Sequence, residues 1–482
     1  MSGCGDNEKK HFVMRTFSTL GSEIDSKAYS EILSEYSKEH KNVVINDTTT
    51  TVSGSYKMEL SLASTYRGAG TPDVIYYSAI SDMSELSDYF VTVDDIRKDY
   101  PNFAKNVSEA SLNSVADDNG RRYCIPIRGE WRGIVINAAL FRRNALRIPS
   151  TWDDIVRAAK NFENSKISLF ANTLEDSGIL AEYMVRSLGG MKSIRSAFNG
   201  SPDSNWDAAL DAINQLDELN AFPKMQNGAF DGYVSESDLK HTSKKGSQSP
   251  VKLFNSEKAA ILLMDNSMCG QIDADIDTEY IALPQIGTIS QSESTTASNT
   301  YPTNVSSGPV YPEMTANTLP PEIPAQPSPD PEKNKGSSEE TKDGKNENGL
   351  YVNFAEGFYI TKKAYFDKTK REDILDFVES FLKEENIIKL CGAYQAPSLK
   401  SLSRKTMDNL TGKSNIYNGV IQSVQKADNF IITTHTRENT FFWERCSLAV
   451  SCMSKGILTK REALRMISDN QLSVKEIYAG RS

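Results

Sequence analysis

Residues 123–162 carry the sequence "YCIPIRGEWRGIVINAALFRRNALRIPSTWDDIVRAAKNF". Two short apolar runs, at 122–127 and 133–137, lie on either side of RGEWRG, and their length predicts strands joined by a glycine-bounded turn. Thr151 and Asp154 then occupy the two side-chain positions of a capping box, which marks the start of a helix. The apolar residues of that helix share one face: Trp152, Ile155, Ala159 and Phe162. The stretch therefore predicts strands that lead into an amphipathic helix.

The same alternation precedes this stretch. Apolar runs at 11–17, 43–47 and 73–78 have the length of strands, and the residues at 29–36 and 55–65 have helical spacing. Strands that alternate with helices predict a largely parallel sheet covered by helices. The expected fold class is therefore α/β.

Length and charge limit the organisation and the function. A chain of 482 residues is longer than one hydrophobic core usually serves, so we expect more than one domain. The formal net charge of −10 argues against a nucleic-acid-binding protein, which would need a basic surface. No apolar run reaches the roughly 18 residues of a membrane-spanning helix, so the sequence predicts none.

One segment differs from the rest of the chain. Residues 288–349 contain nine of the 18 prolines and almost no large apolar side chains. Such a segment cannot bury enough apolar surface to offset the entropy lost on ordering. We expect a disordered Pro/Ser/Glu-rich insertion at this position.

Signals of catalysis, cofactor binding and metal binding are missing from the sequence. The segment GAGTPD lacks the third glycine of a dinucleotide-binding loop, and TGKS lacks the first glycine of a phosphate loop. The four histidines are scattered, and no GxSxG motif is present. Asp273, Asp275 and Asp277 alternate, but the glycine and glutamate of a calcium-binding loop do not follow them. We therefore expect a protein that is not an enzyme and has no cofactor or metal.

Several further segments follow one another in order along the chain. They are KAYSEILSEYSKEHKNVVIN, YKMELSLASTYRGAGTPDVIYYS, the stretch quoted above, LFNSEKAAILLMDNSMCGQI, EYIALPQIG, EGFYITKKA and TFFWERCSLAVSCMSKGILTKREAL. In this order they resemble the family 1 extracellular solute-binding proteins of bacterial ABC importers, in particular the carbohydrate-binding, maltose-type group. The resemblance covers nearly the whole chain apart from the insertion, and it rests on collinear order, with no single decisive motif.

The resemblance implies a two-lobe, type II periplasmic-binding-protein-like fold with a hinge between the lobes. The implied parts are a tether at 1–10, lobe 1 at 11–127 and 350–392, and lobe 2 at 128–287 and 393–482. A small polar solute, in this group most often a sugar or oligosaccharide, would be captured in the cleft between the lobes. The loaded protein, a monomer that binds no nucleic acid, would then deliver the solute to the membrane subunits of an ABC permease.

The resemblance also implies which residues hold the solute, because hydrogen-bonding and aromatic side chains suit sugars. The implied set is Ser18, Thr19, Tyr77, Glu130, Trp131, Asp265, Asn266, Glu356 and Trp443. Each member has a structural alternative. The aromatic residues could belong to the core, Asp265 and Asn266 could be turn residues, and Glu130 could form a surface ion pair with a neighbouring arginine.

The cysteines divide into two kinds. Cys4 follows Ser2 and Gly3, which match the end of a bacterial lipobox. The resemblance therefore implies a lipoprotein held by a lipidated Cys4 at the extracellular face of the cell membrane, as in a Gram-positive bacterium. Cysteines within apolar runs are expected to be buried free thiols: Cys124, Cys269 and Cys391.

Two other functions are compatible with the sequence. A surface-anchored ligand sensor or adhesin would keep the two-lobe fold, and the acidic Pro-rich insertion favours it, since such segments often act as interaction arms. A secreted glycan-cleaving enzyme would instead need two carboxyl groups about 5 to 9.5 Å apart across a bound sugar.

Overall fold

The computed structural model describes the following parts of the chain: 12–19, 23–50, 72–77, 84–117, 119–174, 177–223, 249–281, 350–392, 394–411, 414–431 and 439–469. Cys4, the expected tether at 1–10, the expected helix at 55–65 and the expected insertion at 288–349 lie outside these residues. No helix within the described ranges combines the length and the apolar character that crossing a membrane requires.

In the described part of the chain, ten strands form one mixed sheet with the main order β2-β1-β3-β8-β4-β6-β5. The strands are β1 Phe12–Thr19, β2 Val43–Thr50, β3 Val74–Tyr77, β4 Ile125–Asn137, β5 Ser168–Phe170, β6 Ala259–Asp265, β7 Thr278–Ile281, β8 Leu350–Ile360, β9 Ala396–Pro397 and β10 Phe430–Ile431. The expected α/β class is confirmed. The sheet is less parallel than expected because β4 runs antiparallel to β6, β7, β8 and β9.

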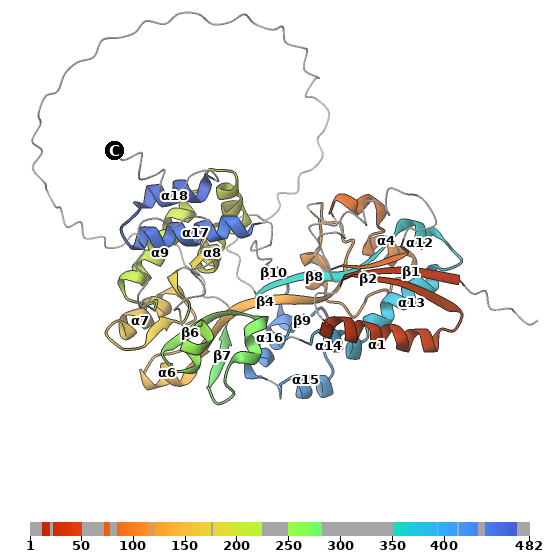
Figure 1. Cartoon of the computed structure of the whole chain (residues 1–482), viewed down its shortest axis with the longest axis horizontal. Coiled ribbons are helices and arrows are strands. Elements are labelled where there is room, and N and C mark those ends of the chain that lie inside the picture. The colour runs from red at the N-terminus through yellow and green to blue at the C-terminus, as the bar shows by residue number, and fades with distance from the viewer. Residues whose placement is uncertain are drawn as a thin grey trace, which may run out of the picture.

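Helices lie at both ends of this sheet. Those around β1 and β2 include α1 Glu23–Glu39, α4 Val93–Asp99, α12 Lys362–Phe366, α13 Arg371–Phe381 and α14 Glu384–Leu390. Those around β5 and β6 include α6 Ala138–Arg143, α7 Trp152–Phe162, α8 Ser177–Phe198, α9 Ser204–Glu218, α11 Pro250–Asn255, α17 Thr440–Ser454 and α18 Lys460–Ser468. The remaining helical segments are η1 Ser84–Tyr89, α5 Glu109–Ser114, η3 Asn266–Gln271, α15 Arg404–Thr411 and α16 Asn415–Lys426. The long strands β4 and β8 connect the two ends (Figure 1).

The turn expected at RGEWRG is wrong, because these residues lie within strand β4. The residues from Ile125 to Asn137 form one continuous strand, so Trp131 lies in a strand and not in a turn. A β-carbon on Gly129 would lie 2.8 Å from Val352, and one on Gly133 would clash with the Tyr280 ring. The glycines therefore permit the close approach of neighbouring side chains. In the sequence alone, a glycine with this function looks the same as a glycine in a turn.

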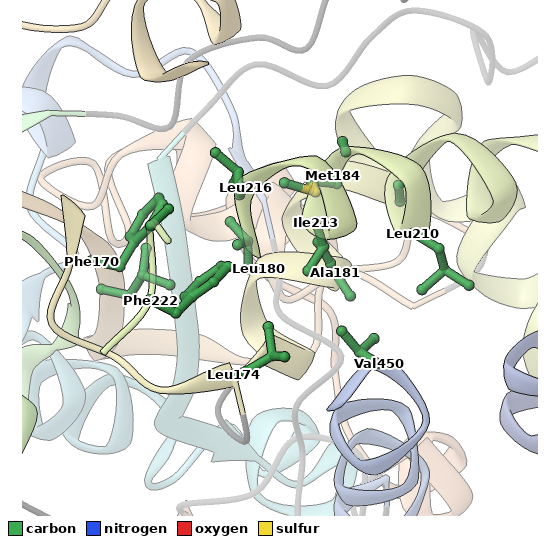
Figure 2. Packing of buried hydrophobic residues seen from close by; sticks show 14 of the residues in the cluster. Phe170, Leu174, Leu180, Ala181, Met184, Leu210, Ile213, Leu216, Phe222 and Val450 are labelled. Carbon is green, nitrogen blue, oxygen red and sulfur yellow. The ribbon is translucent and has the colours of Figure 1, made fainter. Parts of the chain in front are cut away.

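Two separate hydrophobic cores lie at the two ends of the sheet. One packs β1, β3 and the start of β4 against α1, α13 and α14, and it includes Tyr29, Phe358 and Phe377. The other packs β5 and β6 against α7, α8, α9 and α17, and Figure 2 shows part of it around Phe170 and Ile213. A third cluster, which we call the hinge core, includes Trp131 and Val352 and lies along β4 and β8.

The capping box expected before α7 is confirmed. The Asp154 backbone N–H donates to the Thr151 hydroxyl at 3.3 Å, and the Thr151 N–H donates to the Asp154 carboxylate at 3.2 Å. Arg147 also pairs with Asp154, whose side chain is almost fully buried. Hydrogen bonds to the ionised carboxylate hold its pKa well below the ordinary range, against the opposing effect of burial.

The cysteines within the described residues are free thiols, and all five are buried. This confirms the expectation for Cys124, Cys269 and Cys391. Burial raises the pKa of Cys124 and of Cys391 to about 12.

Candidate functional site

The middle of β4 carries a group of polar residues between the two helix-covered ends of the sheet. Glu130 is the only exposed residue of this strand. Arg132 lies two positions further along and therefore on the same face. Arg132 pairs in register with Asp265 of β6 and with Tyr351 of β8. Glu130 pairs with Asn353. We call these five residues the hinge patch, since residues directly opposite one another in a sheet share a face.

The carboxyl group of Glu130 is in an unusual electrostatic environment. Partial desolvation and the nearby carboxylates of Glu356 and Asp265 raise the pKa of Glu130, and the cations of Arg132 and Arg128 oppose this rise only in part. A raised pKa favours the neutral carboxyl form, which can donate a hydrogen bond as well as accept one. Such a group is suited to a hydroxyl-rich ligand.

Asp265 and Asn266 lie where β6 ends and η3 begins. One carboxylate oxygen of Asp265 accepts from the Ser267 backbone N–H at 2.8 Å and from the Ser267 hydroxyl at 2.5 Å. Asn266 is buried. Asp265 therefore caps the turn that begins η3, which is the structural alternative that the sequence left open for it. Contact of these two residues with a solute stays a prediction.

Three expected site residues lie at the ends of the neighbouring strands β1 and β3. Ser18 and Thr19 are the last two residues of β1, and Ser18 pairs with Tyr76 of β3. Their side chains lie outside the described residues. Tyr77 ends β3 and is only 1% exposed, packed in the hinge core. A role for these three residues in binding stays a prediction.

Glu356 lies in β8 beside the hinge patch, and its carboxylate already has two donors. Arg128 and the Tyr76 hydroxyl both donate to its Oε2 atom, the latter at 3.1 Å. Of the two arginines that flank Glu130 in the sequence, Arg128 forms an ion pair with Glu356, which is 228 positions away along the chain.

Both tryptophans of the expected site are buried. Trp131 is 0% exposed, and its indole N–H donates to the Tyr394 carbonyl at 2.6 Å. Trp443 is 2% exposed and lies against Trp206 in a stacked arrangement. In this conformation neither ring has an open face on which a sugar could stack. The exposed aromatic residue at the start of α17 is instead Phe441, at 72%.

The structure adds residues to this region that the sequence did not indicate. Tyr183 of α8 packs edge-on against Tyr351, with ring centres 4.2 Å apart. The Arg186 guanidinium lies 5.9 Å from the centre of the same Tyr351 ring. The sequence offered Arg132 only as a possible ion-pair partner of Glu130, whereas the structure pairs it in register with Asp265 and Tyr351. These residues belong to no motif, and they come together through the pairing of β4 with β8 and the packing of α8 against Tyr351. Within the described residues, no group of His, Cys, Asp or Glu is arranged to hold a metal ion.

The fold resembles that of several solved structures. A probable secreted solute-binding lipoprotein from Streptomyces coelicolor matches with a TM-score of 0.63 at 13% identity, covering 94% of this chain and 98% of that one. The putative binding protein MsmE from Bacillus subtilis, in an open conformation, matches with a TM-score of 0.59 at 13% identity, covering 98% and 100%. The bacterial solute receptor AcbH, described as exclusive for β-D-galactopyranose, matches with a TM-score of 0.61 at 10% identity, covering 95% and 97%. At these identities the matches establish the fold alone.

The family comparison reaches further than the fold. No curated protein sequence matched the chain. A family model described as "bacterial extracellular solute-binding protein" matches residues 21–308, which is more than half of the chain. This agrees with the two-lobe architecture, the hinge strands and the polar patch between the two cores. The chain belongs to the family of bacterial extracellular solute-binding proteins.

Proposed function

We propose that this protein captures a saccharide between its lobes and delivers it to the membrane permease of an ABC importer. The hinge patch on β4 is the observation that carries the proposal. It places the exposed Glu130, with its raised pKa, between two separate hydrophobic cores. A solute bound there would contact both lobes only when they close, and it would stabilise the closed state for that reason.

Solved structures with a similar fold support a saccharide as the solute of this protein. AcbH takes β-D-galactopyranose, and the solute-binding protein RafE has been solved with raffinose. The hinge patch offers carboxyl, guanidinium, amide and phenol groups beside tyrosine rings. This mixture suits the hydroxyls and apolar faces of sugars. Capture of this kind makes and breaks no bond.

A thermal-shift screen tests the proposed solute class. We expect galactose, raffinose or maltose to raise the melting temperature, since a ligand at a hundred times its Kd stabilises the native state by about 2.7 kcal/mol. Glutamine and spermidine are the comparison solutes. Glu130→Ala should weaken the shift, whereas Glu31→Ala, an exposed position on α1, should leave it unchanged. If only glutamine or spermidine raised the melting temperature, the solute would belong to another class and the proposal of a saccharide would be wrong.

The proposal extends to the location of the protein. We propose that a lipid on Cys4 anchors it to the outer face of the cell membrane, supported by the lipobox-like Ser2-Gly3-Cys4. We expect the full-length gene product to incorporate labelled palmitate, and we expect Cys4→Ser to abolish the labelling while Cys124→Ala retains it. Equal labelling of the wild type and Cys4→Ser would rule out this anchor.

A further inference from the structure

Two buried polar groups at the hinge patch form no hydrogen bond within the described residues. The first is the Nη1 atom of Arg132, which lies on β4. The second is the hydroxyl of Tyr183, a residue of α8 that is only 5% exposed. A buried donor without a partner costs free energy, because it has given up its bonds to water. Both groups are therefore available to a ligand that offers an acceptor.

Arg132 and Tyr183 adjoin the same tyrosine. Arg132 lies directly opposite Tyr351 in the pairing of β4 with β8. The Tyr183 ring packs edge-on against Tyr351, with ring centres 4.2 Å apart. Burial raises the pKa of Tyr183 well above its ordinary range, and the Arg132 cation opposes this rise. Since such an effect falls off with distance, the guanidinium and the hydroxyl are neighbours.

The two groups come from different parts of the fold. Arg132 belongs to β4, one of the long strands that connect the two ends of the sheet (Figure 1). The helix that carries Tyr183 is held in the core around β5 and β6, where Leu180, Ala181 and Met184 pack (Figure 2). The position of the Tyr183 hydroxyl beside the hinge patch is therefore fixed by the packing of a whole helix.

The carboxyl groups around Arg132 are engaged elsewhere or favour the neutral form. Glu356 accepts hydrogen bonds from an arginine and a tyrosine. Asp265 accepts from the backbone N–H and the hydroxyl of Ser267. The pKa of Glu130 is raised by partial desolvation and by nearby carboxylates, so its neutral form can donate a hydrogen bond to an anion. The Arg132 guanidinium therefore stays available to a negatively charged group.

We propose that Arg132 and Tyr183 form an anion subsite at the hinge patch, and that the captured saccharide carries a carboxylate or a phosphate. A guanidinium N–H and a phenol O–H are both donors, and a guanidinium suits the oxygens of either anion. Hydrogen bonds to an ionised acceptor are roughly twice as strong as those to a neutral one. The inference rests on the proposed function and narrows its solute from saccharides in general to acidic saccharides.

Calorimetry with matched sugars tests the inference. Galactose, galacturonate and galactose 6-phosphate share one ring and differ only in the group on the terminal carbon. Glucose, glucuronate and glucose 6-phosphate form a second series. We expect the wild type to bind an acidic member of one series with a Kd at least about tenfold below that of its neutral parent. The acidic sugar with the lower Kd identifies the anion as a carboxylate or a phosphate.

Two variants test the assigned residues. Arg132→Gln removes the cation, so we expect the Kd of the preferred acidic sugar to rise at least about tenfold and that of the neutral parent less than about threefold. Tyr183→Phe keeps the ring against Tyr351 and removes one donor, so the Kd of the acidic sugar should rise about threefold. A general loss of structure would affect both sugars alike, so the ratio of the two Kd values reports the anion contact.

Two matched controls remove the same chemical groups elsewhere. Arg142→Gln removes the cation of an exposed pair with Asp277. Tyr359→Phe removes the hydroxyl of another buried tyrosine, which lies in the hinge core beside Cys124. Tyr359 is eight positions from Tyr351 along β8. Both controls should keep the ratio of the two Kd values within about twofold of the wild type, because neither group adjoins the anion subsite.

The outcomes distinguish the anion subsite from the proposed function. If the wild type binds no saccharide, neutral or acidic, with raffinose and maltose included, the proposed function fails. If it binds a neutral sugar as tightly as the acidic sugars, the anion subsite is overturned and the proposed function stands. Equal loss of both sugars in Arg132→Gln overturns the subsite as well. The wild-type ratio and Tyr183→Phe decide the question if Arg132→Gln fails to fold.

Discussion

Replacement of Trp131 by alanine is expected to lower the free energy of unfolding by about 3 to 5 kcal/mol, the usual cost of deleting a buried aromatic side chain. The ring is fully buried in the hinge core, and it lies edge-on to Tyr280 with ring centres 5.7 Å apart. The change would also remove the indole N–H that donates to the Tyr394 carbonyl. Tyr280 lies over Gly133, so the cavity would open in the middle of the hinge.

Urea unfolding of Trp131→Ala and Trp131→Phe measures this effect. Trp131→Phe keeps a ring in the hinge core and loses mainly the hydrogen bond, so it should cost much less than the alanine variant. If Trp131→Ala weakened sugar binding while unfolding at the wild-type urea concentration, the ring would face a solute and not the core.

Replacement of Trp443 by alanine is expected to cost about 3 to 5 kcal/mol as well, but at the other end of the sheet. Its ring lies 6.1 Å from the ring of Trp206 and 4.9 Å from that of Phe442. The contact with Trp206 joins α17 to α9 within the core that also contains α8. We therefore expect hydrogen exchange to accelerate first in α8, α9 and α17.

The adjacent Phe441 supplies a matched control, because it is mostly exposed. Phe441→Ala should change the free energy of unfolding by no more than about 0.5 kcal/mol, as for most surface substitutions. Equal losses in the two variants would contradict the assignment of Trp443 to the core.

Features governed by local spacing were predictable from the sequence. The capping box of Thr151 and Asp154 depends on residues three positions apart, and it forms as expected. The strands at 43–47 and 73–78 appear as β2 and β3 for the same reason. The α/β class follows from such local patterns because each strand or helix is specified mainly by its own residues.

The candidate site was predictable only in part. Glu130 is the exposed member of the hinge patch, whereas Trp131 has its ring in the core on the opposite face of the same strand. The pairing of Arg128 with Glu356 joins residues 228 positions apart, and no local pattern indicates it. The glycines on either side of Trp131 resembled a turn signal, because glycine is required both in tight turns and where a neighbouring side chain lies close to the backbone.

The buried thiols have a consequence for the life of this protein outside the cell. An external environment is oxidising, and the thiolate is the form of cysteine that reacts. Because burial raises the pKa of Cys124 and Cys391 to about 12, these two thiols present almost no thiolate to an oxidant in the folded protein. Unfolding would release these thiols together, and disulfides formed between the wrong partners would then prevent refolding. The packing that holds the fold therefore also sets its resistance to oxidative damage.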